Sequence, residues 1–157
     1  MRRFLYVLLL VLFSLQLQAR GKETKQENVL ANDKNPTTTV MKLKITIGSN
    51  TATAVLYNNQ ASHDFAALLP LSLTLTDYNQ TEKIANLPKK LFTKDAPAGF
   101  DPSAGDLTYF APWGNLALFY KDFSYSTGLV SLGKITSGIE AFNVSGSLEV
   151  KIELDKK

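Results

Sequence analysis

The chain of 157 residues contains no cysteine. This absence excludes disulfide bonds, a thiol nucleophile and every metal site that depends on cysteine ligands. It also excludes a lipid-anchored cysteine behind an export signal. The length and the hydrophobic content of 45% fit one domain with an apolar core.

Histidine is nearly as scarce, because His63 is the only one. A single histidine without cysteine gives no zinc site. It forms no acid–base dyad with Asp64, because sequence neighbours on a helix point to different faces. The chain has no G-x-S-x-G motif and no glycine-rich phosphate-binding motif. Turn chemistry accounts for Asp95, Asp101 and Asp106 better than a calcium site does. We therefore predict no catalytic residue, no metal and no cofactor.

The formal net charge of +3 is weak evidence for a nucleic-acid partner. Arg2 and Arg3 lie in the segment that we expect to be removed on export. Without them, 15 lysine and arginine residues face 14 aspartate and glutamate residues, which gives a formal charge of +1. Lys89 and Lys90 form an adjacent basic pair within the domain, and a solvated face explains them. We predict no nucleic-acid partner and leave the oligomeric state open.

The first 19 residues have the pattern of a secretory signal peptide. Arg2 and Arg3 make a positive start, an apolar run follows from Phe4 to Leu15, and Ala19 ends an imperfect cleavage site of small residues. A membrane span needs roughly 20 apolar residues, and this run is shorter. Cleavage after Ala19 is therefore favoured over an uncleaved anchor, and it would leave no membrane span.

Residues 20–40 are polar and contain few large apolar groups. Such a segment cannot bury enough surface to order itself. It predicts a flexible polar linker between the signal peptide, residues 1–19, and a domain at residues 41–157. No internal repeat or low-complexity stretch divides that domain.

The domain sequence predicts many short strands and few helices. Apolar and polar residues alternate in Lys42–Ile47 and again in Leu148–Leu154, which is the pattern of half-buried strands. Asn58 or Asn59 is suited to cap a short helix, and a second short helix is expected at residues 139–142. This series predicts a mainly β barrel or sandwich. Pairing of the first and last strands would close a barrel and remove its exposed edges.

The most informative stretch is GDLTYFAPWGNLALFY, residues 105–120. Leu107–Phe110 and Leu116–Tyr120 are rich in strand-forming residues. Proline and glycine at Pro112–Asn115 mark a tight connection between them. This stretch therefore predicts a hairpin at the centre of the domain.

Three segments resemble the small bacterial cyclophilin-like domains, a family mostly without an assigned function. They are the hairpin just described, the order LP…L…DY…EK between Leu69 and Lys83, and the closing strand Leu148–Leu154. The resemblance covers roughly Met41 to Leu154. It implies a closed antiparallel cyclophilin-like β-barrel with one or two short helices. It also implies a bacterial source, so the export signal predicts a periplasmic or secreted location.

Arginine is absent from the predicted domain, because Arg2, Arg3 and Arg20 all precede it. Prolyl isomerases of the cyclophilin type hold the carbonyl group of the substrate with a guanidinium. A lysine does not reproduce the planar fork of that group. The resemblance thus implies the fold but argues against the isomerase reaction.

Aromatic residues gather on and beside the hairpin. Trp113 stands apart, because a large ring in a turn is hard to bury. Glu82 and Lys83 offer polar groups at the rim of an apolar groove, with a surface ion pair between them as the simpler alternative. For the rings, the alternative is packing within the barrel. The candidates for a ligand-binding site are Tyr78, Glu82, Tyr109, Trp113, Phe119 and Tyr120.

Taken with the export signal, these features predict an exported, non-catalytic binding domain whose ligand is peptide-like or small and apolar. A divergent peptidyl-prolyl cis-trans isomerase is the alternative, and the missing guanidinium separates it from the first function. A structural interaction module of the cell envelope is the second alternative. An exposed apolar patch around Trp113 would favour the binding of a ligand or a partner.

Overall fold

The structure is a computed structural model that describes residues 41–156. The predicted signal peptide, residues 1–19, and the predicted linker, residues 20–40, lie outside the described residues. The elements are β1 (Lys42–Ile47), β2 (Asn50–Leu56), α1 (Gln60–Ala66), β3 (Leu71–Tyr78), β4 (Glu82–Asn86), β5 (Gly99–Phe100), β6 (Asp106–Phe110), β7 (Asn115–Phe119), β8 (Ser126–Thr127), β9 (Leu129–Ser137), the single-turn helix η1 (Ile139–Phe142) and β10 (Leu148–Leu154).

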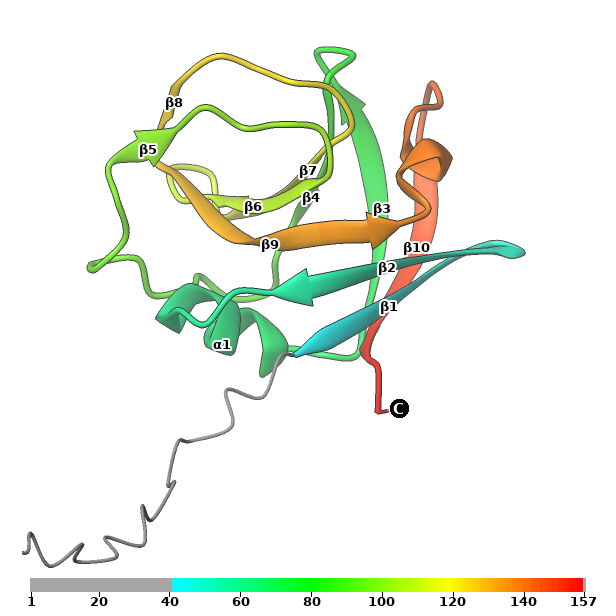
Figure 1. Ribbon diagram of the computed structural model, residues 1–157, viewed down its shortest axis with the longest axis horizontal. Coiled ribbons are helices and arrows are strands. Elements are labelled where there is room, and N and C mark those ends of the chain that lie inside the picture. Colours follow the sequence, from blue (N-terminus) through cyan, green and yellow to red (C-terminus); the bar gives the residue numbers. More distant parts are fainter. Residues whose placement is uncertain (1–40, 157) are drawn as a thin grey trace, which may run out of the picture. The chain divides into compact units, whose positions relative to one another are not determined.

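Eight strands form a closed antiparallel barrel in the order β1-β10-β3-β4-β7-β6-β9-β2 (Figure 1). β1 pairs with β10, from Leu43 opposite Leu154 to Ile47 opposite Val150, and with β2 on its other side. Each barrel strand therefore has a partner on both sides, which removes exposed edges. The predicted mainly β, closed antiparallel barrel is confirmed, and the predicted central hairpin is the pair β6 and β7.

Alternation along β6 and β7 separates two apolar clusters. Tyr109 and Leu116 point inward and join the core of the barrel. Ala117 and Phe119 point outward and pack with Leu129 in a second, smaller cluster. Strands that are buried on both faces need a cover on both, so this side of the barrel carries an outer layer of side chains.

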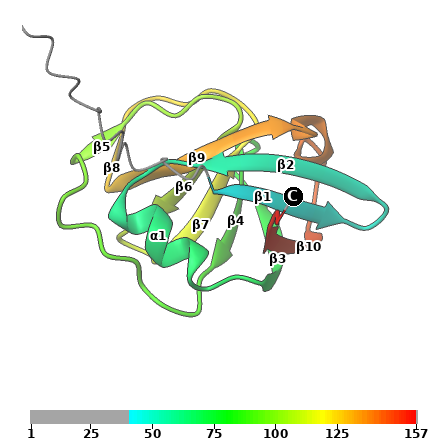
Figure 2. The same cartoon turned by 60° about the horizontal axis from the view of Figure 1, so that its bottom comes forward.

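Helix α1 covers one end of the barrel (Figure 2). Its N-cap is Asn59, whose Oδ1 accepts a hydrogen bond from the backbone N–H of Ser62 at 2.9 Å. Ala61 and Phe65 of the helix are buried in the core, and Phe142 of η1 joins the same core. Both short helices were predicted from the sequence. Within residues 41–156, no helix is long and apolar enough to cross a membrane.

The short strands β5 and β8 pair beside the barrel, with Gly99 opposite Thr127. A Cβ atom at Gly99 would lie 2.2 Å from the carbonyl oxygen of Ser126. Only glycine permits so close an approach of the two backbones. This pairing fixes the segment that carries Ser126 above the outer cluster.

Candidate functional site

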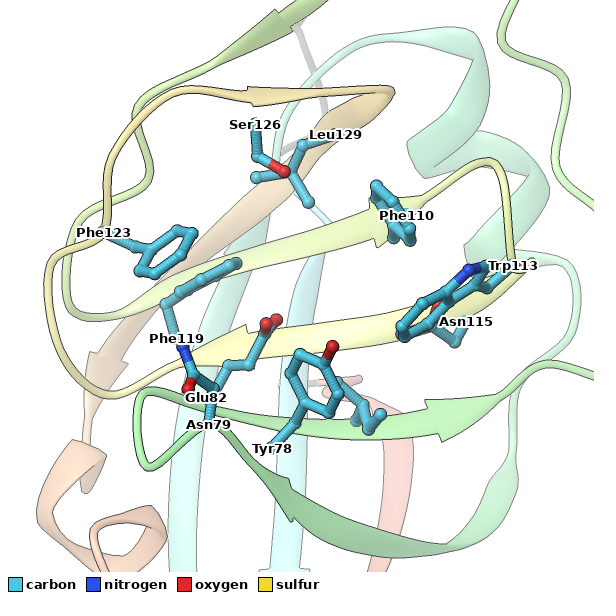
Figure 3. Close-up of a pocket in the computed structure, with 11 residues that line it drawn as sticks. Tyr78, Asn79, Glu82, Phe110, Trp113, Asn115, Phe119, Phe123, Ser126 and Leu129 are labelled. Atoms are coloured by element: carbon cyan, nitrogen blue, oxygen red, sulfur yellow. The ribbon is translucent and has the colours of Figure 1, made fainter.

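A pocket of about 520 Å³ lies on the outer face of the barrel, where side chains of the second apolar cluster line it. Four of the six residues predicted from the sequence lie in its walls (Figure 3). These four are Tyr78, Glu82, Trp113 and Phe119. The complete lining is Tyr78, Asn79, Glu82, Ile84, Phe110, Trp113, Asn115, Phe119, Phe123, Ser126 and Leu129.

Five aromatic rings line this pocket. The ring of Trp113 meets those of Tyr78 and Phe110 edge to face, with centroids 5.6 and 5.3 Å apart. Phe119 and Phe123 stack, with centroids 6.3 Å apart, on the other side of the pocket in Figure 3. Trp113 is 58% exposed. Its indole therefore forms an accessible, largely apolar wall that also carries one N–H donor.

The turn between β6 and β7 holds Trp113 in this position. Gly114 has φ +76°, a left-handed conformation that favours glycine. Its N–H donates a hydrogen bond to the carbonyl of Phe110 at 2.9 Å, and its own carbonyl accepts one from the N–H of Leu87 at 3.2 Å. Because the turn is fixed from both sides, the preceding indole projects from the hairpin toward Tyr78.

Glu82 carries the only carboxyl group among the lining residues. The strand register places it opposite Tyr78 of β3 and opposite Phe119 of β7, and Figure 3 shows its carboxyl group pointing into the pocket. Within the described chain, this carboxyl group has no hydrogen bond and no ion pair. Burial raises the pKa of Glu82 to about 7, because burial disfavours the charged form of an acid. The pocket thus holds a carboxyl group that changes charge near neutral pH.

Asn115 adds a second polar group to the pocket wall. It is only 3% exposed and lies behind the indole of Trp113 in the view of Figure 3. Nδ2 donates a hydrogen bond to the carbonyl of Leu116 at 3.2 Å. Oδ1 has no hydrogen-bond partner among residues 41–156. A buried acceptor without a donor costs about 1–3 kcal/mol, so a ligand that supplies a donor here would relieve this cost.

The sequence profile of the cyclophilin-like family matches residues 45–153, well over half of the chain. The chain belongs to the cyclophilin-like family. Its fold is similar to the solution structure of a hypothetical protein from Archaeoglobus fulgidus, with a TM-score of 0.56 and 19% sequence identity. That match covers 74% of this chain and 95% of the archaeal one, and at this identity it concerns the fold alone. No curated protein matches the chain.

Two predicted site residues of this cyclophilin-like domain lie outside the pocket. Tyr109 points into the barrel core, 1% exposed, and its hydroxyl accepts a long hydrogen bond from the N–H of Leu91 at 3.4 Å. Tyr120 also lies on the inner side, where its hydroxyl donates to Asp77 at 2.7 Å. Burial, and then this hydrogen bond, raises the pKa of Tyr120 to about 12. The same hydrogen bond, and then Lys83, hold the pKa of Asp77 below its ordinary value.

Lys83 does not form the surface ion pair with Glu82 that was the simpler interpretation of the sequence. Neighbours in a strand point to opposite faces, so Lys83 points into the barrel and is fully buried. Its Nζ lies 3.0 Å from the carboxylate of Asp77. It also donates hydrogen bonds to the carbonyl oxygens of Val144 and Gly146. The partner of Lys83 is therefore Asp77, and Glu82 is left without one.

The six candidate residues predicted from the sequence do not include Asn115 or Phe123, which also line the pocket. A signal for Asn115 was available. Strand residues alternate in direction, so Asn115 shares the outward face of β7 with Phe119. Phe123 belongs to the aromatic residues that gather beside the hairpin in the sequence, but no local pattern shows that it stacks on Phe119 and lines the pocket.

The remaining polar residues considered in the sequence lie outside this pocket. Among the described residues, no group of three or more histidine, aspartate or glutamate side chains is placed to bind a metal ion. His63 bonds to Asn58 rather than to Asp64. Asp106 accepts a hydrogen bond from the N–H of Ser103 at 2.8 Å, which is a local turn contact.

A second pocket of about 330 Å³ lies between α1 and residues 92–97. Its only aromatic lining residues are Phe92 and Phe100. It is smaller, and it contains neither the projecting indole nor a half-buried carboxyl group without a partner. The pocket beside Trp113 is therefore the stronger candidate for a ligand site.

Proposed function

We propose that this protein is an exported, non-catalytic binding protein whose barrel holds a small apolar or peptide-like ligand in the pocket beside Trp113. The observation that carries the proposal is the pocket itself, with five aromatic rings in its walls and a carboxyl group that has no partner in the described chain. Its volume falls in the range of about 300–1,000 Å³ that is typical of small-molecule sites. Mostly apolar walls with a few polar groups are typical of such sites as well.

A binding function is favoured over a divergent prolyl isomerase, because the domain lacks the cation that the isomerase reaction needs. Residues 41–157 contain no arginine, and a cyclophilin-type isomerase needs a guanidinium at the substrate carbonyl. Lys83 cannot replace it, because its Nζ points to the opposite face of β4 and is bound to Asp77. A proline-peptide isomerisation assay is expected to give a rate at background. A rate well above background, with contaminating isomerases controlled for, would favour the enzyme instead.

Export is supported by the charged start and the short apolar run of the first 19 residues. Mass spectrometry of the periplasmic or secreted protein should find a mature chain that begins near Arg20. A mature species that retains Met1–Leu17 would contradict export with cleavage and would favour a membrane anchor.

The binding proposal is tested by the fluorescence of Trp113, the only tryptophan of the chain. Phenethyl alcohol and the blocked dipeptide acetyl-Phe-Pro-amide are the two probes. Saturable changes of the emission are expected with at least one of them. Ser126→Phe should abolish the change, because a ring at this lining position fills the pocket. Thr127→Phe is the matched control, since Thr127 is exposed and does not line the pocket. Emission that responds to neither probe, or that responds equally in both variants, would contradict the proposal.

A further inference from the structure

The pocket beside Trp113 is unusual in its balance of charge. Its lining contains a carboxyl group, five aromatic rings and a buried amide oxygen, but no lysine, arginine or histidine. We propose that this pocket binds an organic ammonium ion, with Glu82 as its counter-charge and the aromatic rings as its walls. This inference rests on the proposed function, since it names the ligand class of the same pocket.

The unpaired carboxyl group of Glu82 favours a cationic ligand. Glu82 is half-buried, and taking a carboxylate out of water costs free energy unless it is paired or hydrogen-bonded. No described group pairs with Glu82. The nearest buried lysine in sequence, Lys83, is already held by Asp77 on the other face of the strand. An ammonium group would supply the missing positive charge together with hydrogen-bond donors. A carboxylate or phosphate ligand would instead place a second negative charge beside Glu82, with no cation in the lining to offset it.

The arrangement of the aromatic rings also suits a cation. The face of an aromatic ring is negative, and it attracts a cation that lies within about 6 Å of the centroid, most strongly for tryptophan. Trp113, Tyr78 and Phe110 meet edge to face, and Phe119 stacks on Phe123. In Figure 3 these two groups of rings lie on either side of the carboxyl group of Glu82. A cation beside Glu82 would therefore lie between aromatic walls, and the apolar body of the ligand would contact the rest of them.

The pocket wall also contains a hydrogen-bond acceptor without a donor, which an ammonium group could supply. Oδ1 of Asn115 has no donor among residues 41–156, and an ammonium group carries up to three N–H donors. One donor can bind Glu82, which leaves others for a second acceptor. Trp113 and Asn115 both line the pocket, so a ligand that donates to Oδ1 would lie close to the indole. We therefore expect the emission of Trp113 to change more with an ammonium ligand than with a neutral one.

The test compares three probes of nearly the same shape by calorimetry on the purified protein. Phenethylammonium is the cation, phenethyl alcohol the neutral analogue and phenylacetate the anion. We expect phenethylammonium to bind at least about tenfold more tightly than phenethyl alcohol, which corresponds to about 1.4 kcal/mol. Phenylacetate should bind most weakly of the three.

Glu82→Gln isolates the contribution of the carboxylate. It should reduce the preference for the cation over the alcohol to less than about threefold, while the alcohol binds as before. Glu140→Gln is the matched control, because it removes the same charge from an exposed residue outside the pocket. It should leave the preference unchanged.

One more probe, Nα-acetyl-lysine-amide, distinguishes two sources of the ammonium group, a lysine side chain of a peptide and a free amine. Tighter binding of this probe than of phenethylammonium would assign the site to a lysine side chain of a peptide, and weaker binding would assign it to a free aromatic amine. If the alcohol binds but the cation is not preferred, the ammonium inference is overturned and the binding function stands. A preference that survives Glu82→Gln also overturns the inference. If none of the probes binds, both the inference and the proposed function fail.

Discussion

Glu82 and Lys83 are neighbours in β4, yet their side chains lie on opposite faces of that strand and in different surroundings. The inner face surrounds Lys83 with a carboxylate and two backbone carbonyl oxygens. The outer face leaves Glu82 among aromatic rings without a partner in the described chain. Lys83 is fully buried and Glu82 is half-buried, but only Lys83 has a partner of opposite charge within the described chain.

This difference separates a structural charge from a candidate functional one. Lys83 joins β3 and β4, through Asp77, to the loop at Val144 and Gly146, so its contacts connect segments that are far apart in the sequence. The carboxyl group of Glu82 makes no hydrogen bond or ion pair that would connect segments of the described chain. A half-buried charge without a partner costs free energy, and ionisable groups with perturbed pKa values cluster at functional sites.

The largest expected effect on stability comes from removing the charge of Lys83 on the inner face of β4. Lys83→Met keeps the aliphatic chain but leaves Asp77 and two carbonyl groups without their cation. The free energy of unfolding should fall by about 3 kcal/mol, as is typical when one partner of a buried pair is removed. Urea unfolding measures the change.

The control for Lys83→Met is Lys151→Met, which breaks the exposed ion pair of Lys151 with Glu153. A change below about 1 kcal/mol is expected for an exposed pair. Equal effects of the two substitutions would contradict the structural role of Lys83.

Glu82, on the outer face of β4, should make the free energy of unfolding depend on pH. The pKa of Glu82 is raised from 4.5 to about 7, so the folded state binds this proton more tightly than the unfolded state does. The free energy of unfolding should therefore fall as the pH rises from 4.5 through about 7. Discounted for its partial exposure, the loss should be about 1–2 kcal/mol.

Glu82→Gln should remove this part of the pH dependence, because glutamine does not titrate. Glu140→Gln should keep it. Chemical unfolding at a series of pH values decides between the two outcomes. A wild-type protein whose stability rises across this window, with Glu82→Gln following the same curve, would show that Glu82 is not destabilised by its surroundings.

The smallest expected effect concerns the turn that joins β3 to β4. Asn79 and Gln80 both adopt positive φ, +52° and +55°, a left-handed conformation that costs a residue with a side chain roughly 1–2 kcal/mol. Gln80→Gly should raise the free energy of unfolding by about 0.5 kcal/mol, because relief of this strain exceeds the added freedom of the unfolded chain. Gln80→Ala, which keeps the strain, should give no gain. Thermal unfolding of the two variants measures the difference.

The sequence was sufficient to predict the barrel but only part of the pocket. Alternation in Lys42–Ile47 and Leu148–Leu154 predicted both strands and their pairing, because a single buried face fixes the register. The rings of the hairpin were harder to assign. β6 and β7 are apolar on both faces, so composition does not show that Tyr109 points inward and Phe119 outward. Nor does any local pattern show that Lys83 is buried, since its partners are remote in the sequence.

The most direct test of the account follows the indole N–H of Trp113, a single resonance, in nitrogen–proton correlation spectra. Phenethylammonium is titrated into the wild-type protein and into Ser126→Phe. We predict a saturable shift of this resonance in the wild type, together with shifts in β4 and β7, and no shift in Ser126→Phe. A resonance that stays unchanged while signals elsewhere in the barrel move, or that moves equally in both proteins, would contradict the assignment of the pocket beside Trp113 as the ligand site.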